Sequence, residues 1–106
     1  MAYIYQVSFE LKPEQMSELR IGAGVERVLS YLRALLPEEV GYLSSRAAYT
    51  LERSTGILVV FESEWETWED LLAHRNSALA ETKVLAEFRP HITLDDITVH
   101  ALREID

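Results

Sequence analysis

The first part of the chain alternates between apolar and polar residues with the period of a β-strand. Five apolar or aromatic side chains share one face over residues 2–11: Tyr3, Tyr5, Val7, Phe9 and Leu11. The alternation stops before Pro13, which cannot continue a hydrogen-bonded ladder but can open a helix. The pattern therefore predicts a first strand over residues 2–11.

Between Pro13 and Pro37 the apolar residues recur with the period of an amphipathic helix. The residues that share one stripe are Ile21, Val25, Val28, Leu29, Leu32, Leu35 and Leu36. Gly22 and Gly24 stand where the phase of this stripe changes, which predicts a kink or a break in the helix at that point. Pro37 ends the helix, and Gly41 marks the turn that follows.

The second half of the chain repeats the order of strand and helix. Strands are predicted over residues 42–51, 57–61 and 97–102, with a hairpin loop over residues 52–56. Thr67 can cap a second helix, which we expect to continue, with a bend, to residue 87 or 88. The order β-α-β-β-α-β predicts a ferredoxin-like α+β domain over residues 1–106, an antiparallel sheet with two helices on one face. Right-handed crossovers place the first and third strands in the middle of that sheet.

The third predicted strand, residues 57–61, is apolar at every position. In an antiparallel sheet with one face in water it should alternate, and two helices can cover only one face. A second copy of the same sheet is the simplest cover for the other face, so the pattern predicts a homodimer through the sheet, with Val59 or Val60 at the interface. The alternative is a small exposed apolar patch, which monomers tolerate.

Composition and charge narrow the range of functions. Hydrophobic residues make up 48% and charged residues 26% of the 106 residues, which excludes disorder and leaves no membrane span. The net charge of −8 argues against binding to nucleic acids or to anionic membranes. Cysteine is absent, and the N-terminus has no basic start, so we expect a cytoplasmic protein without disulfides or thiolate chemistry.

Candidate chemical groups are few. His74 lies on the flank of the second helix's apolar stripe, where it is either a boundary residue with a backbone or carboxylate partner or a catalytic base. Trp65 anchors a core or lines a pocket. Tyr5 and Tyr49 line a cavity or are ordinary strand aromatics. The acidic residues 62–70 favour a solvated face at a helix N-terminus over a metal site.

The residues from Val59 to His74 resemble the signature segment of the antibiotic biosynthesis monooxygenase-like family. The shared features are an apolar strand, an acidic residue, a tryptophan at the start of the helix and an Ala-His pair, with Trp65 and His74 at the family's spacing. The resemblance implies a dimeric α/β barrel. It also implies oxidation of a small aromatic, such as a quinol or a polyketide anthrone, by O₂ without a metal or flavin cofactor, or oxidative breakdown of haem.

Carried onto this chain, the resemblance gives His74 the role of base and Trp65 that of a pocket wall, while Tyr5 and Tyr49 are pocket residues by strand phase. Family members that oxidise quinols often have a second histidine one turn later, and residues 75–79 contain none. Those that degrade haem use an asparagine on the first strand, where this chain has Val7, so haem breakdown is not expected.

Two hypotheses follow for the function. The first is a homodimeric, cofactor-independent monooxygenase that acts on a small aromatic. The second is a non-catalytic dimeric module that binds a small apolar ligand or only assembles, and it is favoured if Trp65, His74 and the tyrosines are buried against one another. An isomerase with His74 as a proton shuttle also suits the fold but has no motif. If His74 is the base, His74→Ala should abolish oxidase activity and leave stability within about 1 kcal/mol, as an ordinary surface-like substitution does.

Overall fold

The computed structural model describes residues 2–12, 16–50, 56–89 and 91–105. Four strands form one sheet: β1 (Tyr3–Leu11), β2 (Tyr42–Tyr49), β3 (Ile57–Trp65) and β4 (Thr98–Arg103). Three helices accompany it: α1 (Glu18–Leu35), α2 (Trp68–Ser77) and α3 (Leu79–Phe88). Two 3₁₀ turns, η1 (Leu36–Glu38) and η2 (Leu94–Asp96), precede β2 and β4. Of the hairpin loop predicted over residues 52–56, residues 52–55 lie outside the described residues.

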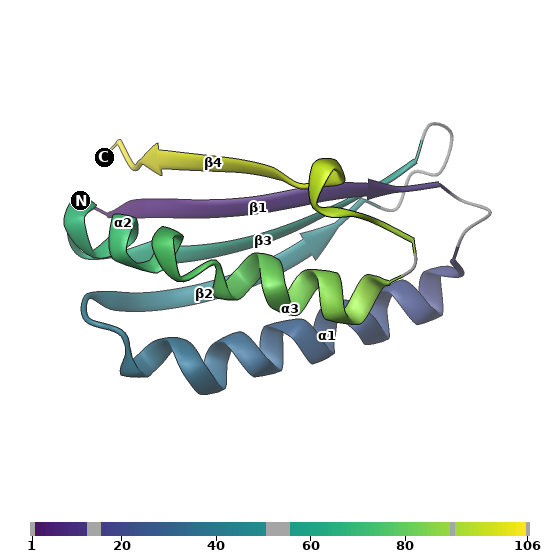
Figure 1. Ribbon diagram of the computed structural model, residues 1–106, viewed down its shortest axis with the longest axis horizontal. Helices are drawn as coiled ribbons and strands as arrows, with labels where there is room; N and C mark the ends of the chain where they lie inside the picture. The colour runs from purple at the N-terminus through teal and green to yellow at the C-terminus, as the bar shows by residue number, and fades with distance from the viewer. Residues whose placement is uncertain (1, 13–15, 51–55, 90, 106) are drawn as a thin grey trace.

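The sheet has the order β2-β3-β1-β4, and its neighbouring strands are antiparallel. The first and third strands therefore occupy the middle, as predicted, and the helices lie on the same side of the sheet (Figure 1). This arrangement confirms the ferredoxin-like α+β fold. The described ends of the chain lie close together, at the start of β1 and the end of β4 (Figure 1).

The core lies between the sheet and the helices. The odd-numbered residues of β1 and β3 face it, so Val7, Phe9, Val59 and Phe61 are buried. The even-numbered residues of the same strands lie on the opposite face, which we call the open face, and Leu58 there is 37% exposed. Burial thus alternates along β3 although its first five residues are all apolar. The structure places Val60 on the open face and Val59, fully buried, in the core.

The break predicted at Gly22 and Gly24 does not occur, because α1 runs unbroken through both. A Cβ on Gly24 would lie 3.0 Å from the Phe88 ring of α3, and one on Gly22 would lie 3.0 Å from the Tyr49 hydroxyl of β2. The two glycines allow neighbouring elements to approach the helix closely, which is a requirement of packing rather than of backbone geometry.

The third strand continues four residues beyond its predicted end, to Trp65. Glu62 and Glu64 therefore lie on the open face of β3. The acidic run had predicted that they lie at the N-terminus of a helix, and this is wrong for these two residues. The helix itself starts where predicted, since the Thr67 side chain accepts a hydrogen bond from the backbone N–H of Asp70 at 3.1 Å.

The expected bend in the second helix is a full break. Ala78 separates α2 from α3 with φ of 52° and ψ of 26°, a left-handed conformation that is uncommon for a residue other than glycine. The Ser77 hydroxyl donates to the carbonyl of His74 at 2.6 Å and closes the last turn of α2. This break lets α2 cover β1 and β3 while α3 packs against α1.

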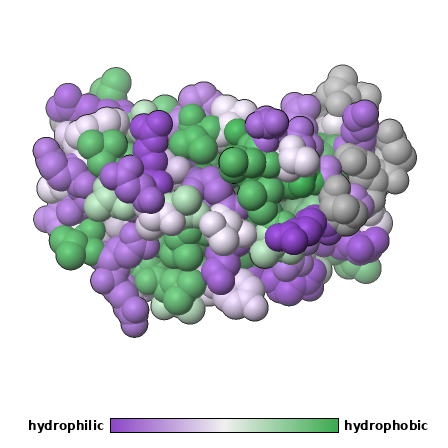
Figure 2. All heavy atoms as spheres, in the orientation of Figure 1, coloured by the Kyte–Doolittle hydropathy of each residue, from purple (hydrophilic) through white to green (hydrophobic). Residues whose placement is uncertain are grey.

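Figure 2 shows green apolar patches separated by purple polar side chains on the side that it presents. None of the helices in the described ranges is long and apolar enough to cross a membrane.

Candidate functional site

His74 lies inside the protein and not at its boundary. Its side chain is 1% exposed and stacks on the Trp65 indole, with ring centroids 4.6 Å apart and planes 22° apart. The Tyr5 ring meets the same imidazole edge-to-face at 5.0 Å. The expectation of a surface-like residue is therefore wrong, and His74→Ala should cost about 2–4 kcal/mol, as other large-to-small core substitutions do.

The two nitrogens of the His74 ring have different surroundings. Nδ1 lies 3.3 Å from Oε1 of Glu39, a residue in the turn after η1. Nε2 is buried and has no hydrogen-bond partner among the described residues. A carboxylate only accepts hydrogen bonds, so an N–H at Nδ1 is the donor of this contact, and in that tautomer Nε2 carries the ring's free lone pair.

A second buried polar pair lies on the other side of the same cluster. The Tyr5 hydroxyl donates to Oε1 of Glu81 at 2.5 Å, and the two residues are 3% and 8% exposed. Burial, and after it the hydrogen bond to Glu81, raises the pKa of the Tyr5 phenol far above its usual value. The phenol therefore keeps its proton throughout the physiological range.

Tyr5, Trp65 and His74, three of the four site residues predicted from the sequence, lie together around one small cavity. Tyr5 and His74 line it, together with Glu62, Ser63 and apolar side chains from β1, β3, α1, η1 and α3. Trp65 forms the support behind His74, and its indole N–H donates to the Ser63 hydroxyl at 2.8 Å. The cavity volume is about 10 Å³, the space of roughly one water molecule.

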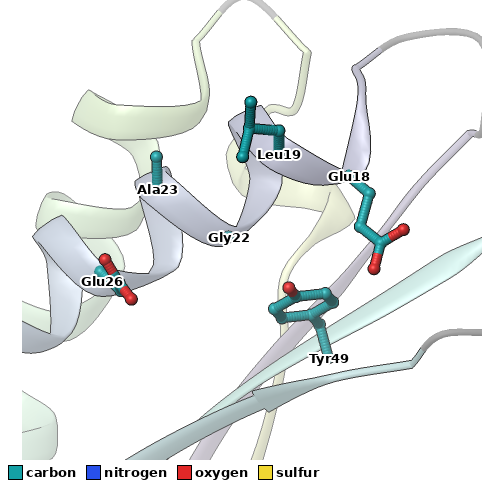
Figure 3. A pocket seen from close by; sticks show the side chains of 6 residues that line it. All are labelled: Glu18, Leu19, Gly22, Ala23, Glu26 and Tyr49. Carbon is teal, nitrogen blue, oxygen red and sulfur yellow. The ribbon is translucent and has the colours of Figure 1, made fainter.

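Tyr49 lies apart from this cluster. It lines an open groove of about 490 Å³ between α1 and β2, with its hydroxyl below Gly22 and with Glu18 and Glu26 nearby (Figure 3). Strand phase places Tyr49 on the helix side of the sheet as predicted, but at the opposite end of β2 from the residues that face Trp65. The structure does not bring Tyr49 together with His74.

Glu39 and Glu81 are the polar residues of the site that the sequence did not indicate. Glu39 is 35 residues from His74, and Glu81 is 76 residues from Tyr5, so neither contact follows from local spacing. A buried carboxylate on a helix has a weak signal in the sequence: Glu81 and Val84 share one side of α3, next to Ala80 and Phe88. Within the described ranges, no three His, Asp or Glu side chains are grouped to hold a metal ion.

Comparison with known proteins supports the fold. No protein-family model matches the chain, and no curated protein is similar to it in sequence. Among solved structures, the chain is similar to a dimeric ferredoxin-like protein of unknown function from Bacteroides fragilis NCTC 9343, with a TM-score of 0.66, 10% identity and coverage of 97% of this chain and 96% of that one.

Two further structures share the fold at a similar level. A dimeric ferredoxin-like protein of unknown function from Jannaschia sp. CCS1 has a TM-score of 0.60 and 17% identity, covering 96% of this chain and 99% of that one. A monooxygenase from the gene ActVA-Orf6 of Streptomyces coelicolor, in complex with the ligand Nanaomycin D, has a TM-score of 0.62 and 17% identity, covering 99% and 88%. At these identities the similarity establishes the fold.

Proposed function

We propose that this protein is a homodimeric oxidoreductase of the antibiotic biosynthesis monooxygenase-like type, which oxidises a small quinol with O₂ at the His74 cavity. The observation that carries this proposal is the setting of His74. The imidazole is buried at the wall of a cavity, its Nδ1 contacts Glu39, and its Nε2 has no hydrogen-bond partner among the described residues. An unsatisfied buried nitrogen costs stability, which a purely structural side chain would avoid. The fold shared with a Streptomyces coelicolor monooxygenase supports the reaction class.

The chemistry requires a base. Nε2 accepts a hydroxyl proton from the bound quinol, and the resulting anion is richer in electrons and reacts more readily with O₂. Glu39 holds the ring in the productive tautomer and stabilises the imidazolium that forms. One quinol and one O₂ give one hydroxyquinone and one water, so the substrate itself supplies all four electrons.

Homodimer formation through the open face is part of this proposal. Apolar residues with partial exposure lie on that face: Ile4, Leu58, Val60, Ala48 and Leu102. They surround a polar centre in which Gln6 and Arg46 hydrogen-bond Glu62 at 2.7 and 2.6 Å. Burial alone would raise the pKa of Glu62, but these two hydrogen bonds outweigh it and hold the pKa below its usual value. Proteins with this fold from Bacteroides fragilis and Jannaschia are dimers, which supports the same assembly here.

The size of the cavity favours a second candidate, a non-catalytic dimeric module. Pockets for small organic ligands usually measure about 300–1,000 Å³, whereas this cavity has about 10 Å³. Tyr5, Trp65 and His74 are also buried against one another. A quinol therefore binds only if α2 and α3 move away from the sheet, and a protein in which they do not move has no oxidase activity.

Oxygen uptake by the purified protein separates the two candidates. The substrates are a panel of quinols and polyphenols at matched pH, with a no-protein control. We expect His74→Gln, which approximates the size of the ring without its base, to lower kcat by about 100-fold or more. Glu39→Gln should lower it by about 10-fold, because it keeps a polar contact but removes the charge. His91→Gln, a histidine change in the loop after α3, is the matched control and should retain activity.

Thermal unfolding of each variant accompanies these assays. If His74→Gln keeps its activity, His74 is not the base, whatever its effect on stability. If no substrate gives uptake above the no-protein control, the non-catalytic module becomes the better description.

A further inference from the structure

Among the described residues, the buried hydrogen bond between Tyr5 and the Glu81 carboxylate has no part in the chemistry proposed for His74. Both side chains come from elements that bound the cavity, β1 and α3. The Glu81 side chain is only 8% exposed, and burying a carboxylate costs free energy. Its hydrogen-bond donor here is the neutral phenol of Tyr5 and not a cation. The carboxylate oxygen that accepts this hydrogen bond lies where the phenol proton can be transferred to it.

The geometry connects this carboxylate to the cavity through the phenol. Tyr5 donates its proton to Glu81 at 2.5 Å, so the lone pairs of its oxygen remain available to a hydroxyl bound beside it. When that hydroxyl donates to Tyr5, the phenol proton passes to Glu81, and Tyr5 is neutral both before and after. The raised pKa of the Tyr5 phenol agrees with this role, in which Tyr5 passes a proton on without becoming a phenolate.

We propose that Tyr5 and Glu81 form a second proton-accepting route in the cavity, so that the site removes both hydroxyl protons of a bound quinol, one to His74 and one through Tyr5 to Glu81. This inference rests on the proposed function and adds that the site takes up the protons of both hydroxyl groups of the quinol. Loss of both protons gives the dianion, the most electron-rich form of the quinol. The two protons leave with the oxygen atom that departs as water, which restores His74 and Glu81 for the next turnover.

Other groups near the pair set its electrostatics. His74 of α2 meets the Tyr5 ring edge-to-face, and the positive charge of Arg75, also on α2, opposes the rise in the pKa of Tyr5. The cavity lining also includes Glu62 of β3 and the apolar side chains of Leu32, from α1, and Leu36, from η1. Glu81 is a positioning residue in this scheme, since it acts through Tyr5, and Tyr5 is the group that touches the substrate.

The test is O₂ uptake with 1,4-dihydroxynaphthalene between pH 6.5 and 9.5, corrected for the reaction without protein. Glu81→Gln keeps an acceptor for the Tyr5 hydroxyl but cannot take up the proton. We expect its kcat at pH 6.5 to fall by about 10- to 100-fold with KM within about 3-fold of wild type. The deficit should shrink towards pH 9.5, where the quinol loses protons to the solvent. A purely structural defect would persist at every pH.

Two further variants complete the design. Tyr5→Phe breaks the route at its other end and should show the same pH-dependent deficit. Glu87→Gln is the matched control: it removes a carboxylate from the same helix, at an ion pair with Arg27, and should behave as wild type. If the wild type is active and both Glu81→Gln and Tyr5→Phe retain its kcat at pH 6.5, the second route is wrong and the proposed function stands. If the wild type shows no uptake, both are wrong.

Discussion

A buried phenol that keeps its proton makes stability depend on pH in the alkaline range. Burial and the hydrogen bond to Glu81 raise the pKa of Tyr5 in the folded protein, whereas in the unfolded chain a tyrosine ionises near pH 10. A raised folded pKa gives stability that is fully present below the unfolded value and is lost as pH rises. The free energy of unfolding should therefore fall above about pH 10, and Tyr5→Phe should flatten this fall.

Urea unfolding at several pH values between 8 and 11 measures this effect. Tyr31→Phe, which removes a hydroxyl from the exposed side of α1, is the control for the loss of a phenol. Equal slopes for Tyr5→Phe and wild type above pH 10 would show that Tyr5 does not retain its proton in the fold.

At the scale of the elements, the packing of α1 explains why Gly22 and Gly24 stand in this helix. It also predicts that alanine has a different effect on stability at the two positions. Replacing a helical glycine by alanine gains up to about 1 kcal/mol of helix propensity where there is room for the methyl group. At Gly24 the new Cβ would lie 3.0 Å from the fully buried Phe88 ring, which cannot move aside, so Gly24→Ala should destabilise the protein by about 1–3 kcal/mol. At Gly22 the nearest atom is the hydroxyl of Tyr49, at the end of a side chain beside an open groove.

Gly22→Ala should therefore be neutral or stabilising by a few tenths of a kcal/mol. Chemical denaturation of the two variants compares them directly, since each adds one methyl group to the same helix. A similar loss of stability at both positions would contradict the idea that only the Phe88 contact is rigid.

At the scale of the whole molecule, the proposed dimer is tested at the open face of the sheet. If this face pairs with a second copy, Val60→Asp buries an uncompensated carboxylate in the interface and should shift the protein from dimer to monomer. Val59 is not a useful probe, because it is buried in the core of the protomer and an aspartate there would unfold it.

Light scattering or analytical ultracentrifugation gives the mass of each species. Ala86→Asp adds the same charge at an exposed position of α3, on the helix side, and should leave the mass unchanged. An unchanged dimer mass for a folded Val60→Asp protein would place the interface elsewhere.

The sequence pointed to three of the residues that the fold brings together. Strand phase placed Tyr5 on the buried face, and the family resemblance singled out Trp65 and His74, which stack on each other. The sequence did not identify Glu39 or Glu81, because their partners lie 35 and 76 residues away and no periodic pattern links them. Tyr49 was chosen by the same strand argument as Tyr5, yet it lies over another part of α1.

Apolar patterns with a period of two or of 3.6 residues depend only on neighbouring residues in the sequence, and they determine which segments form strands or helices and which face is buried. The sequence therefore predicted the order of strands and helices, the two central strands and the buried face of β1. Only the tertiary structure decided how the two glycines of α1 are used, where β3 ends and which carboxylates meet His74 and Tyr5. These features depend on contacts between segments far apart in the chain. Such contacts exist only once the helices have packed on the sheet.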